Sequence, residues 1–275
     1  RLILVSFIIA LTTALDMSNR VILVTGGNKG IGKAICKKIV ETHSDCIVLL
    51  GSRDEERGSS ACADIISSVP SASSRITPIK LDVTSPSSIT SAADLVSNLH
   101  PSGLYGIVNN AGIGFGRTIK DTVTCNTIGP KLVNDAFIPL LRKDGEKRIV
   151  NIASASGPNF VKTLTPDDQQ WYQNPAVTWD EIQSKIQSVW EQPDYDNTAY
   201  GFSKALLNLY TLHLANAHPT ISINSCTPGW IATDLTAGMG ASNPPEKGTL
   251  APMHCLFGDL KGAQGWYFGS DAVRS

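Results

Sequence analysis

The chain has 275 residues, 42% of them hydrophobic, which is enough for one large domain with an extensive core. Charged residues make up only 17%, the formal net charge is -1, and no run of basic residues occurs. This composition argues against nucleic acid or an anionic membrane as a partner. Chemistry on a small molecule is the function class that it favours.

The first sixteen residues, RLILVSFIIALTTALD, form an apolar run too short to span a bilayer. They are either the end of a secretory signal, with Thr12 and Ala14 before a cleavage point, or sequence upstream of a true start at Met17. The second interpretation is slightly favoured, because Met17 stands just before the first predicted strand. We therefore expect a cytoplasmic protein without a stable membrane span and with a catalytic domain over 17–275. Entry into the secretory pathway is the alternative.

Cysteine usage also favours a reducing compartment. The six cysteines show no CxxC pair and no metal-ligand spacing, so buried free thiols and no metal site are expected. Cys226 lies beside the expected ligand site, where a reactive thiol is conceivable, but an inert buried thiol is the favoured interpretation.

Apolar runs rich in β-branched residues alternate with stretches of helical spacing. VILVT precedes a helix expected over 30–42, CIVLL one over 54–68, and ITPIKLDV one over 86–99. The alternation continues with LYGIVNN, a helix around 121–143, RIVNIAS, a helix opening at NTAYG, and ISINSCTPG. Continuous apolar strands are buried on both faces, so the sequence predicts a single α/β domain with a doubly wound parallel sheet.

Residues 158–196 interrupt this rhythm. Within them, TWDEIQSKIQSVWEQ begins with a capping-box pattern, Thr178 and Glu181. Apolar residues then follow one helical face: Ile182, Ile186, Val189 and Trp190. We expect an inserted amphipathic helix that lies on the domain.

The segment TGGNKGIG follows the first predicted strand and spaces Gly26, Gly30 and Gly32 as G-x-x-x-G-x-G. Glycine lets a backbone approach a pyrophosphate, and the helix that follows offers free N–H groups to the anion. An ordinary tight turn is the alternative, but the position at the start of a βαβ series favours a dinucleotide site.

The end of the second strand, LLGSRDEERG, indicates which dinucleotide is bound. An acid there would bind the adenosine ribose, whereas Arg53 suits the 2′-phosphate of NADP, and Lys29 can approach from the other side. Asp54 is better placed to start the next helix. Arg57 is equally interpretable as a phosphate contact or a solvated helix residue. NADPH is the predicted cofactor.

A reacting centre is indicated by Tyr200 and Lys204, which lie one helical turn apart. A neighbouring ammonium is expected to lower the pKa of the phenol, which could then give a proton to a carbonyl oxygen. Ser154 ends a strand and could hold the same oxygen, and Asn126 lies in the preceding helix. Each has an ordinary alternative as a helix, cap or backbone-satisfying residue, but their order along the chain favours a nicotinamide reductase.

With these residues assembled, the chain resembles short-chain dehydrogenases/reductases over 20–270, and within that family it is similar to monomeric NADPH-dependent carbonyl reductases. The matching segments are TGGNKGIG, SRDEERG, LDV at 81–83, NNAG at 109–112, CNTIG at 125–129, Ser154, AYGFSK and PGWIATD at 228–234. The resemblance implies a Rossmann fold and a catalytic tetrad of Asn126, Ser154, Tyr200 and Lys204. Tyr200 would donate the proton, Ser154 steady the carbonyl, Lys204 bind the nicotinamide ribose and Asn126 hold a relay water.

The cofactor contacts implied by the resemblance are similarly local. Asp82 and Val83 would border the adenine, although Asp82 is alternatively a turn residue, and Asn110 would lie at the adenosine ribose. The full cofactor-binding set is Gly26, Asn28, Lys29, Gly30, Ile31, Arg53, Arg57, Asp82, Val83, Asn110, Tyr200, Lys204, Ile231 and Thr233.

Substrate contacts are expected from Ser154, Tyr200 and Trp230, although Trp230 could simply pack, and residues 235–248 are expected to form a mobile flap. The resemblance implies a monomer, since the 158–196 insertion would cover the usual oligomer surface. The predicted function is NADPH-dependent reduction of a ketone, aldehyde or quinone. A specialised steroid or terpenoid ketone reductase and a non-catalytic NADPH sensor are the alternatives.

Overall fold

The computed structural model describes residues 19–192 and 198–275. The leader over 1–16, the start at Met17 and the last part of the 158–196 insertion lie outside the described residues. No helix in the described ranges is long and apolar enough to cross a membrane.

Seven parallel strands form one sheet in the order β3-β2-β1-β4-β5-β6-β7. The chain order reverses between β1 and β4, and this is the point at which doubly wound sheets bind ligands beyond the carboxyl ends of their strands. The strands are β1 (Arg20–Val24), β2 (Cys46–Ser52), β3 (Ile76–Lys80), β4 (Gly106–Asn109), β5 (Arg148–Ile152), β6 (Ser222–Cys226) and β7 (Tyr267–Phe268).

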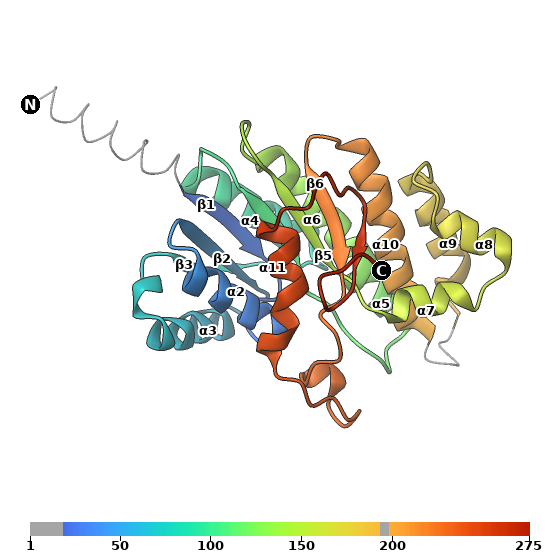
Figure 1. Ribbon diagram of the computed structural model, residues 1–275, viewed down its shortest axis with the longest axis horizontal. Coiled ribbons are helices and arrows are strands. Elements are labelled where there is room, and N and C mark those ends of the chain that lie inside the picture. Colours follow the sequence, from blue (N-terminus) through green and yellow to red (C-terminus); the bar gives the residue numbers. More distant parts are fainter. Residues whose placement is uncertain (1–18, 193–197) are drawn as a thin grey trace, which may run out of the picture.

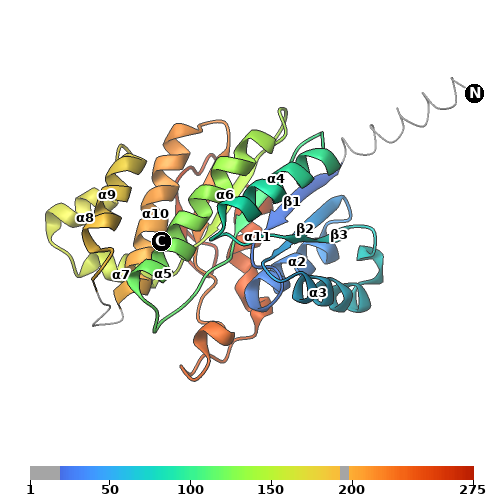
Figure 2. The same ribbon diagram turned by 180° about the vertical axis from the view of Figure 1, so that it is seen from behind.

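Helices cover both faces of this sheet, as the continuous apolar strands predicted. One face packs against α2 (Gly30–Thr42), α3 (Glu55–Ser68) and α11 (Leu250–Phe257) (Figure 1). The other face packs against α4 (Pro86–Leu99), α6 (Gly129–Phe137) and α10 (Thr198–Ala217), which lie across the sheet in Figure 2. The predicted doubly wound fold is confirmed.

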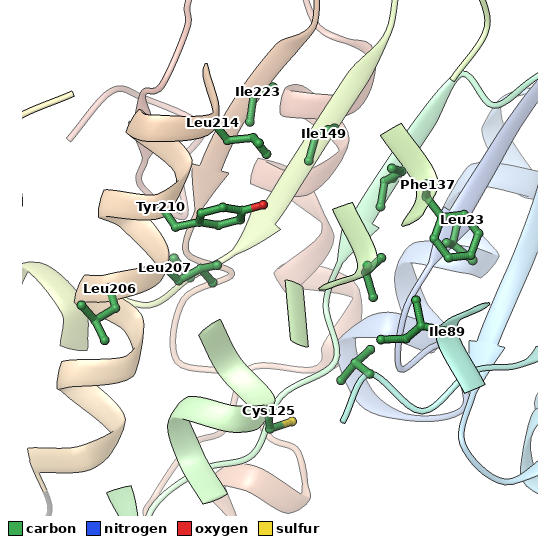
Figure 3. Close-up of a cluster of buried hydrophobic side chains, with 14 of the residues drawn as sticks. Leu23, Ile89, Cys125, Phe137, Ile149, Leu206, Leu207, Tyr210, Leu214 and Ile223 are labelled. Atoms are coloured by element: carbon green, nitrogen blue, oxygen red, sulfur yellow. The ribbon is translucent and has the colours of Figure 1, made fainter. Parts of the chain in front are cut away.

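Helix α10 supplies a large share of one core. Leu207, Tyr210 and Leu214 project from it toward the sheet, as Figure 3 shows, and Leu206 belongs to the same core. The Tyr210 ring is buried, and its hydroxyl accepts a hydrogen bond from the Asn134 amide at 3.3 Å. This packing fixes the helix that carries Tyr200 and Lys204 against the strands.

The single helix expected around 121–143 is wrong in detail. The structure has α5 (Ile119–Val123), a π-helical turn (Thr124–Ile128), α6 and a 3₁₀ turn (Ile138–Leu140). Pro130 has no N–H, so it cannot make the α-helical bond to the carbonyl of Asn126. The N–H of the preceding residue, Gly129, bonds to the carbonyl of Thr124, five residues back, which is the π-helical pattern. The helix therefore changes its pitch at the predicted tetrad residue Asn126.

The segment inserted before Tyr200 contains more structure than expected. The expected amphipathic helix is α9 (Trp179–Val189), with both capping-box bonds present and Ile182 and Ile186 buried. Two seven-residue helices were not expected, α7 (Ser156–Lys162) and α8 (Pro166–Tyr172). These helices are too short for a visible periodicity, although Thr165 followed by Pro166 is a helix-start signal.

Helix α7 approaches α10 closely because both helices present glycine at their contact. A Cβ on Gly157 would lie 2.9 Å from the backbone carbon of Lys204, and one on Gly201 would lie 3.1 Å from the carbonyl oxygen of Ser156. These contacts are backbone to backbone, so neither neighbour can swing aside. The two glycines hold the strand-end serine segment against the tyrosine helix.

We therefore expect Gly157→Ala to push α7 away from α10 and to lower the free energy of unfolding by about 1–3 kcal/mol, as overpacking does elsewhere. Urea unfolding measures this loss. Asn159→Ala, at an exposed position of the same helix, is the matched control and should stay within about 0.5 kcal/mol of the native chain. Equal stability of the two variants would contradict the close approach.

Candidate active site

The glycine loop has the geometry that an anion cradle requires. Gly26 and Gly30 have φ of 64° and 53°, in the left-handed region that glycine tolerates. A Cβ on Gly32 would lie 2.3 Å from the carbonyl oxygen of Gly26. Helix α2 starts after Lys29 without a side-chain cap, so no side chain takes its first N–H groups. The loop therefore fits the pyrophosphate of a dinucleotide.

Asn110 supports this loop from the end of β4. Its side-chain amide donates to the carbonyl of Thr25 at 2.8 Å and to that of Gly26 at 3.2 Å. Its backbone N–H donates to the Thr25 hydroxyl at 3.0 Å. Asn110 thus shapes the loop, and its expected contact with the adenosine ribose stays a prediction, as do those of Asn28 and Ile31.

The cations expected at the 2′-phosphate lie in different surroundings. Arg53 is exposed and has no hydrogen-bond or ion-pair partner within the described residues. Asp54 caps α3 through a 2.9 Å bond from the backbone of Arg57, which confirms its expected role at the helix start. The Nε of Arg57 lies 3.5 Å from the Asp54 carboxylate, and Lys29 pairs with Asp234 at 2.6 Å.

The residues expected at the adenine follow β3. The carboxylate of Asp82 accepts bonds from the backbone N–H and the hydroxyl of Thr84 at 2.9 and 2.7 Å. The turn role weighed for Asp82 is thus observed. Val83 is buried against Gly129. Their contact with adenine stays a prediction.

The Tyr200 side chain is buried, with 8% exposure, and packs against Phe115 at 4.6 Å between ring centroids. Burial raises the pKa of its phenol, and a hydrogen bond with Ser154 lowers that pKa by less. The expected lowering of the Tyr200 pKa by Lys204 is therefore wrong for these side chains. Desolvation outweighs the neighbouring groups.

Lys204 faces the same region from one turn further along α10. Its ammonium donates to the carbonyl of Ile152, at the end of β5, at 2.8 Å. It lies 5.8 Å from the centroid of the Tyr200 ring. Burial lowers the pKa of Lys204 to about 8. Ser154, Tyr200 and Lys204 are therefore brought together, as predicted.

Hydrogen bonds link the Asn126 side chain to the loop after β4 and to helix α10. Its side-chain oxygen accepts from the N–H of Ile113 at 2.9 Å, and its amide donates to the carbonyl of Ile113 at 3.0 Å and to the Ser203 hydroxyl at 3.1 Å. The side chain satisfies buried groups, which was the ordinary alternative. Its role at a relay water stays a prediction.

The segment after β6 lies over the glycine loop. The methyl of Thr233 would be 3.3 Å from a Cβ on Gly30, and Ile231 is buried. Trp230 is 46% exposed, so it does not simply pack in the core, and its substrate contact stays a prediction. The expected flap at 235–248 includes two 3₁₀ turns, Asp234–Thr236 at its start and Pro245–Thr249 at its end.

Sequence reasoning missed Phe115 and Asp234, which contact predicted site residues. Phe115 stands between two glycines just after NNAG, and this was a usable signal for a ring presented at the site. Asp234 gave no such signal, because its partner Lys29 is 205 positions away. All six cysteines are free and buried, as expected, and burial raises the pKa of Cys226, which supports the inert interpretation.

Comparison with known proteins agrees with this geometry. The profile of the family described as short chain dehydrogenase matches residues 20–166. "Carbonyl reductase [NADPH] 1" of Mus musculus is 30% identical over 94% of this chain and 99% of its own. "(+)-neomenthol dehydrogenase" of Arabidopsis thaliana is 30% identical over 86% and 95%. The solved structure of salutaridine reductase from Papaver somniferum superposes with a TM-score of 0.79, 25% identity and coverage of 90% and 99%.

The chain belongs to the short-chain dehydrogenase family, and the predicted similarity to carbonyl reductases is confirmed. It is therefore an oxidoreductase acting on carbonyl or alcohol groups.

The lowered pKa of Lys204 makes stability depend on pH. The folded chain releases this proton near pH 8, whereas the unfolded chain keeps it to about 10.5. Between these values the unfolded state binds more protons, so stability rises with pH. Relative to Lys204→Met, the native chain should gain about 2–3 kcal/mol of unfolding free energy between pH 8 and 10.5, measured in urea. A difference in stability between the native chain and Lys204→Met that stays constant with pH would contradict the lowered pKa.

Proposed function

We propose that the protein is an NADPH-dependent carbonyl reductase that converts ketones, aldehydes or quinones to alcohols. The observation that carries the proposal is the buried Tyr200 phenol one helical turn before Lys204, whose ammonium donates to the carbonyl of Ile152, two residues before Ser154. NADPH is the cofactor, supported by the glycine loop, the unpaired Arg53 and the cofactor named with the mouse relative.

NADPH supplies a hydride to the carbonyl carbon when it is bound. Tyr200 donates its phenolic proton to the carbonyl oxygen, and the raised pKa of this phenol keeps it protonated at neutral pH. Ser154 donates a hydrogen bond to the same oxygen. Lys204 holds the nicotinamide ribose, and the buried Asn126 keeps the loop after β4 in place.

The cofactor contacts we propose follow the carboxyl ends of the strands. The glycine loop holds the pyrophosphate, Asp82 and Val83 border the adenine, and Ile231 and Thr233 meet the nicotinamide half. Arg53 and Lys29 take the 2′-phosphate. The order of these segments along the sheet supports this assignment.

A specialised terpenoid or steroid ketone reductase is the second candidate. Two observations favour it. The relatives named above include a neomenthol dehydrogenase and a salutaridine reductase. Trp230, before the flap, and Met239, within it, are 46% and 42% exposed, so apolar surface is available there to a bulky substrate.

We further propose a monomer in the cytoplasm. Trp179 of α9 packs on Tyr210 of α10 at 5.4 Å between ring centroids, so the inserted segment covers part of that helix. Six unpaired buried thiols support a reducing compartment. Size-exclusion chromatography with light scattering tests the monomer, and a dimer or tetramer would contradict it.

The function is tested by following NADPH oxidation against quinones, aromatic aldehydes, steroids and monocyclic terpenoid ketones, with NADH in parallel. Turnover of many carbonyls supports a general carbonyl reductase, and one strong substrate supports the specialised enzyme. No turnover of any carbonyl despite NADPH binding would contradict both and favour a sensor.

Tyr200→Phe removes the proton donor and keeps the ring. We expect a loss of about 10²–10⁴-fold in kcat, the usual contribution of a positioned acid, with the Kd for NADPH nearly unchanged. Single-turnover rates and a fluorescence titration with NADPH separate the two effects. Tyr172→Phe, a buried tyrosine of α8, is the control, and unchanged turnover in Tyr200→Phe would contradict the assigned acid.

Arg53→Ala removes the exposed guanidinium expected at the 2′-phosphate. A charged hydrogen bond of this kind corresponds to about 10- to 100-fold in affinity, so the Kd for NADPH should rise by that factor. The Kd for NADH should change little, because it has no 2′-phosphate. Calorimetric titration of both cofactors checks this, and equal weakening would count against the phosphate contact.

A further inference from the structure

The ion pair between Lys29 and Asp234 joins the two sides of the cofactor site. The Lys29 ammonium lies 2.6 Å from the Asp234 carboxylate, across 205 positions of sequence. Lys29 is the residue before helix α2, and Asp234 begins the 3₁₀ turn that leads into the flap. The contact therefore fastens the start of the flap to the glycine loop.

Asp234 also acts on the cations assigned to the cofactor phosphate. The hydrogen bond and charge of Lys29 lower the pKa of Asp234, and the charge of Arg57 lowers it further by a smaller amount. The Asp234 carboxylate is thus bound to the Lys29 ammonium, at which we place the cofactor phosphate. The two groups are alternative anions for one ammonium.

The pair can be broken without unfolding the protein. Lys29 and Asp234 keep 61% and 78% of their side-chain surface exposed, and ion pairs this exposed contribute little to stability. Nothing packs closely on the flap at Gly238 and Gly240, because both have positive φ and no neighbour within 4 Å of an added Cβ. A dianionic phosphate would outcompete the single carboxylate.

We propose that Asp234 is a specificity-determining residue that holds Lys29 until the 2′-phosphate of the cofactor displaces it. The displacement frees the start of the flap at residue 234, so the 2′-phosphate is read at the loop that borders the substrate side. This inference rests on the proposed function, since it needs Lys29 at the phosphate. It assigns to Asp234 a role that neither the glycine loop nor the tetrad requires.

Two fragments isolate the effect from nicotinamide contacts: 2′,5′-ADP carries the phosphate, and 5′-AMP lacks it. Asp234→Asn removes the competing charge and should bind 2′,5′-ADP about two- to five-fold more tightly than the native chain, with 5′-AMP unchanged. Calorimetric titration at low salt measures both. The gain should disappear in a Lys29→Gln background, because the two residues act through one contact.

Asp64→Asn is the matched control, since Asp64 pairs with Lys33 of α2, and not with Lys29, at the same 2.6 Å. It should leave both affinities unchanged. Hydrogen exchange of residues 237–242 provides a second measurement: 2′,5′-ADP should speed exchange in the native chain and 5′-AMP should not. In Asp234→Asn, exchange should already be fast without a ligand.

The outcomes separate this inference from the proposed cofactor site. If the native chain prefers 2′,5′-ADP but Asp234→Asn binds it no more tightly, the role of Asp234 is wrong and the cofactor site stands. An equal gain in Asp64→Asn would also overturn that role, because a general charge effect would explain it. If the native chain binds both fragments equally, the 2′-phosphate site itself is wrong.

Discussion

The site depends on the buried hydrogen bond from the Lys204 ammonium to the carbonyl of Ile152. This bond fixes helix α10 to the end of strand β5, two residues before Ser154. A buried ammonium without such a partner would be strongly destabilising, so the bond also dictates where the helix can lie. Tyr200, one turn earlier on α10, is then held beside Ser154 by the backbone and not by a flexible side chain.

Close backbone packing completes that constraint. Gly157 and Gly201 let α7 and α10 touch along their backbones, and a larger residue at either position would separate the serine from the tyrosine. Burial raises the pKa of the Tyr200 phenol, so this group stays protonated at neutral pH. The proposed role of Tyr200 as the proton donor requires this form.

Much of the fold could be predicted from local sequence. Continuous apolar strands and helical spacing located β1 to β6 along the chain, and the capping box at Thr178 located the start of α9. The helix expected around 121–143 failed at Gly129 and Pro130, where a missing N–H competes with apolar periodicity. Helices α7 and α8 were missed because seven residues give less than two full turns of pattern.

In the site, too, local features could be predicted and long-range contacts could not. Residues whose role depends on the chain next to them, such as Gly26, Gly30 and Tyr200 with Lys204, could be predicted from spacing. Contacts made only by folding could not: Asn126 with Ser203 and Lys29 with Asp234 join segments 77 and 205 positions apart. These long-range contacts decide which predicted groups are free to bind a ligand. Arg53 is left unpaired in the described chain, whereas Lys29 is paired with Asp234. The two cations have the same expected role, but a phosphate must displace a carboxylate to reach Lys29 and none to reach Arg53.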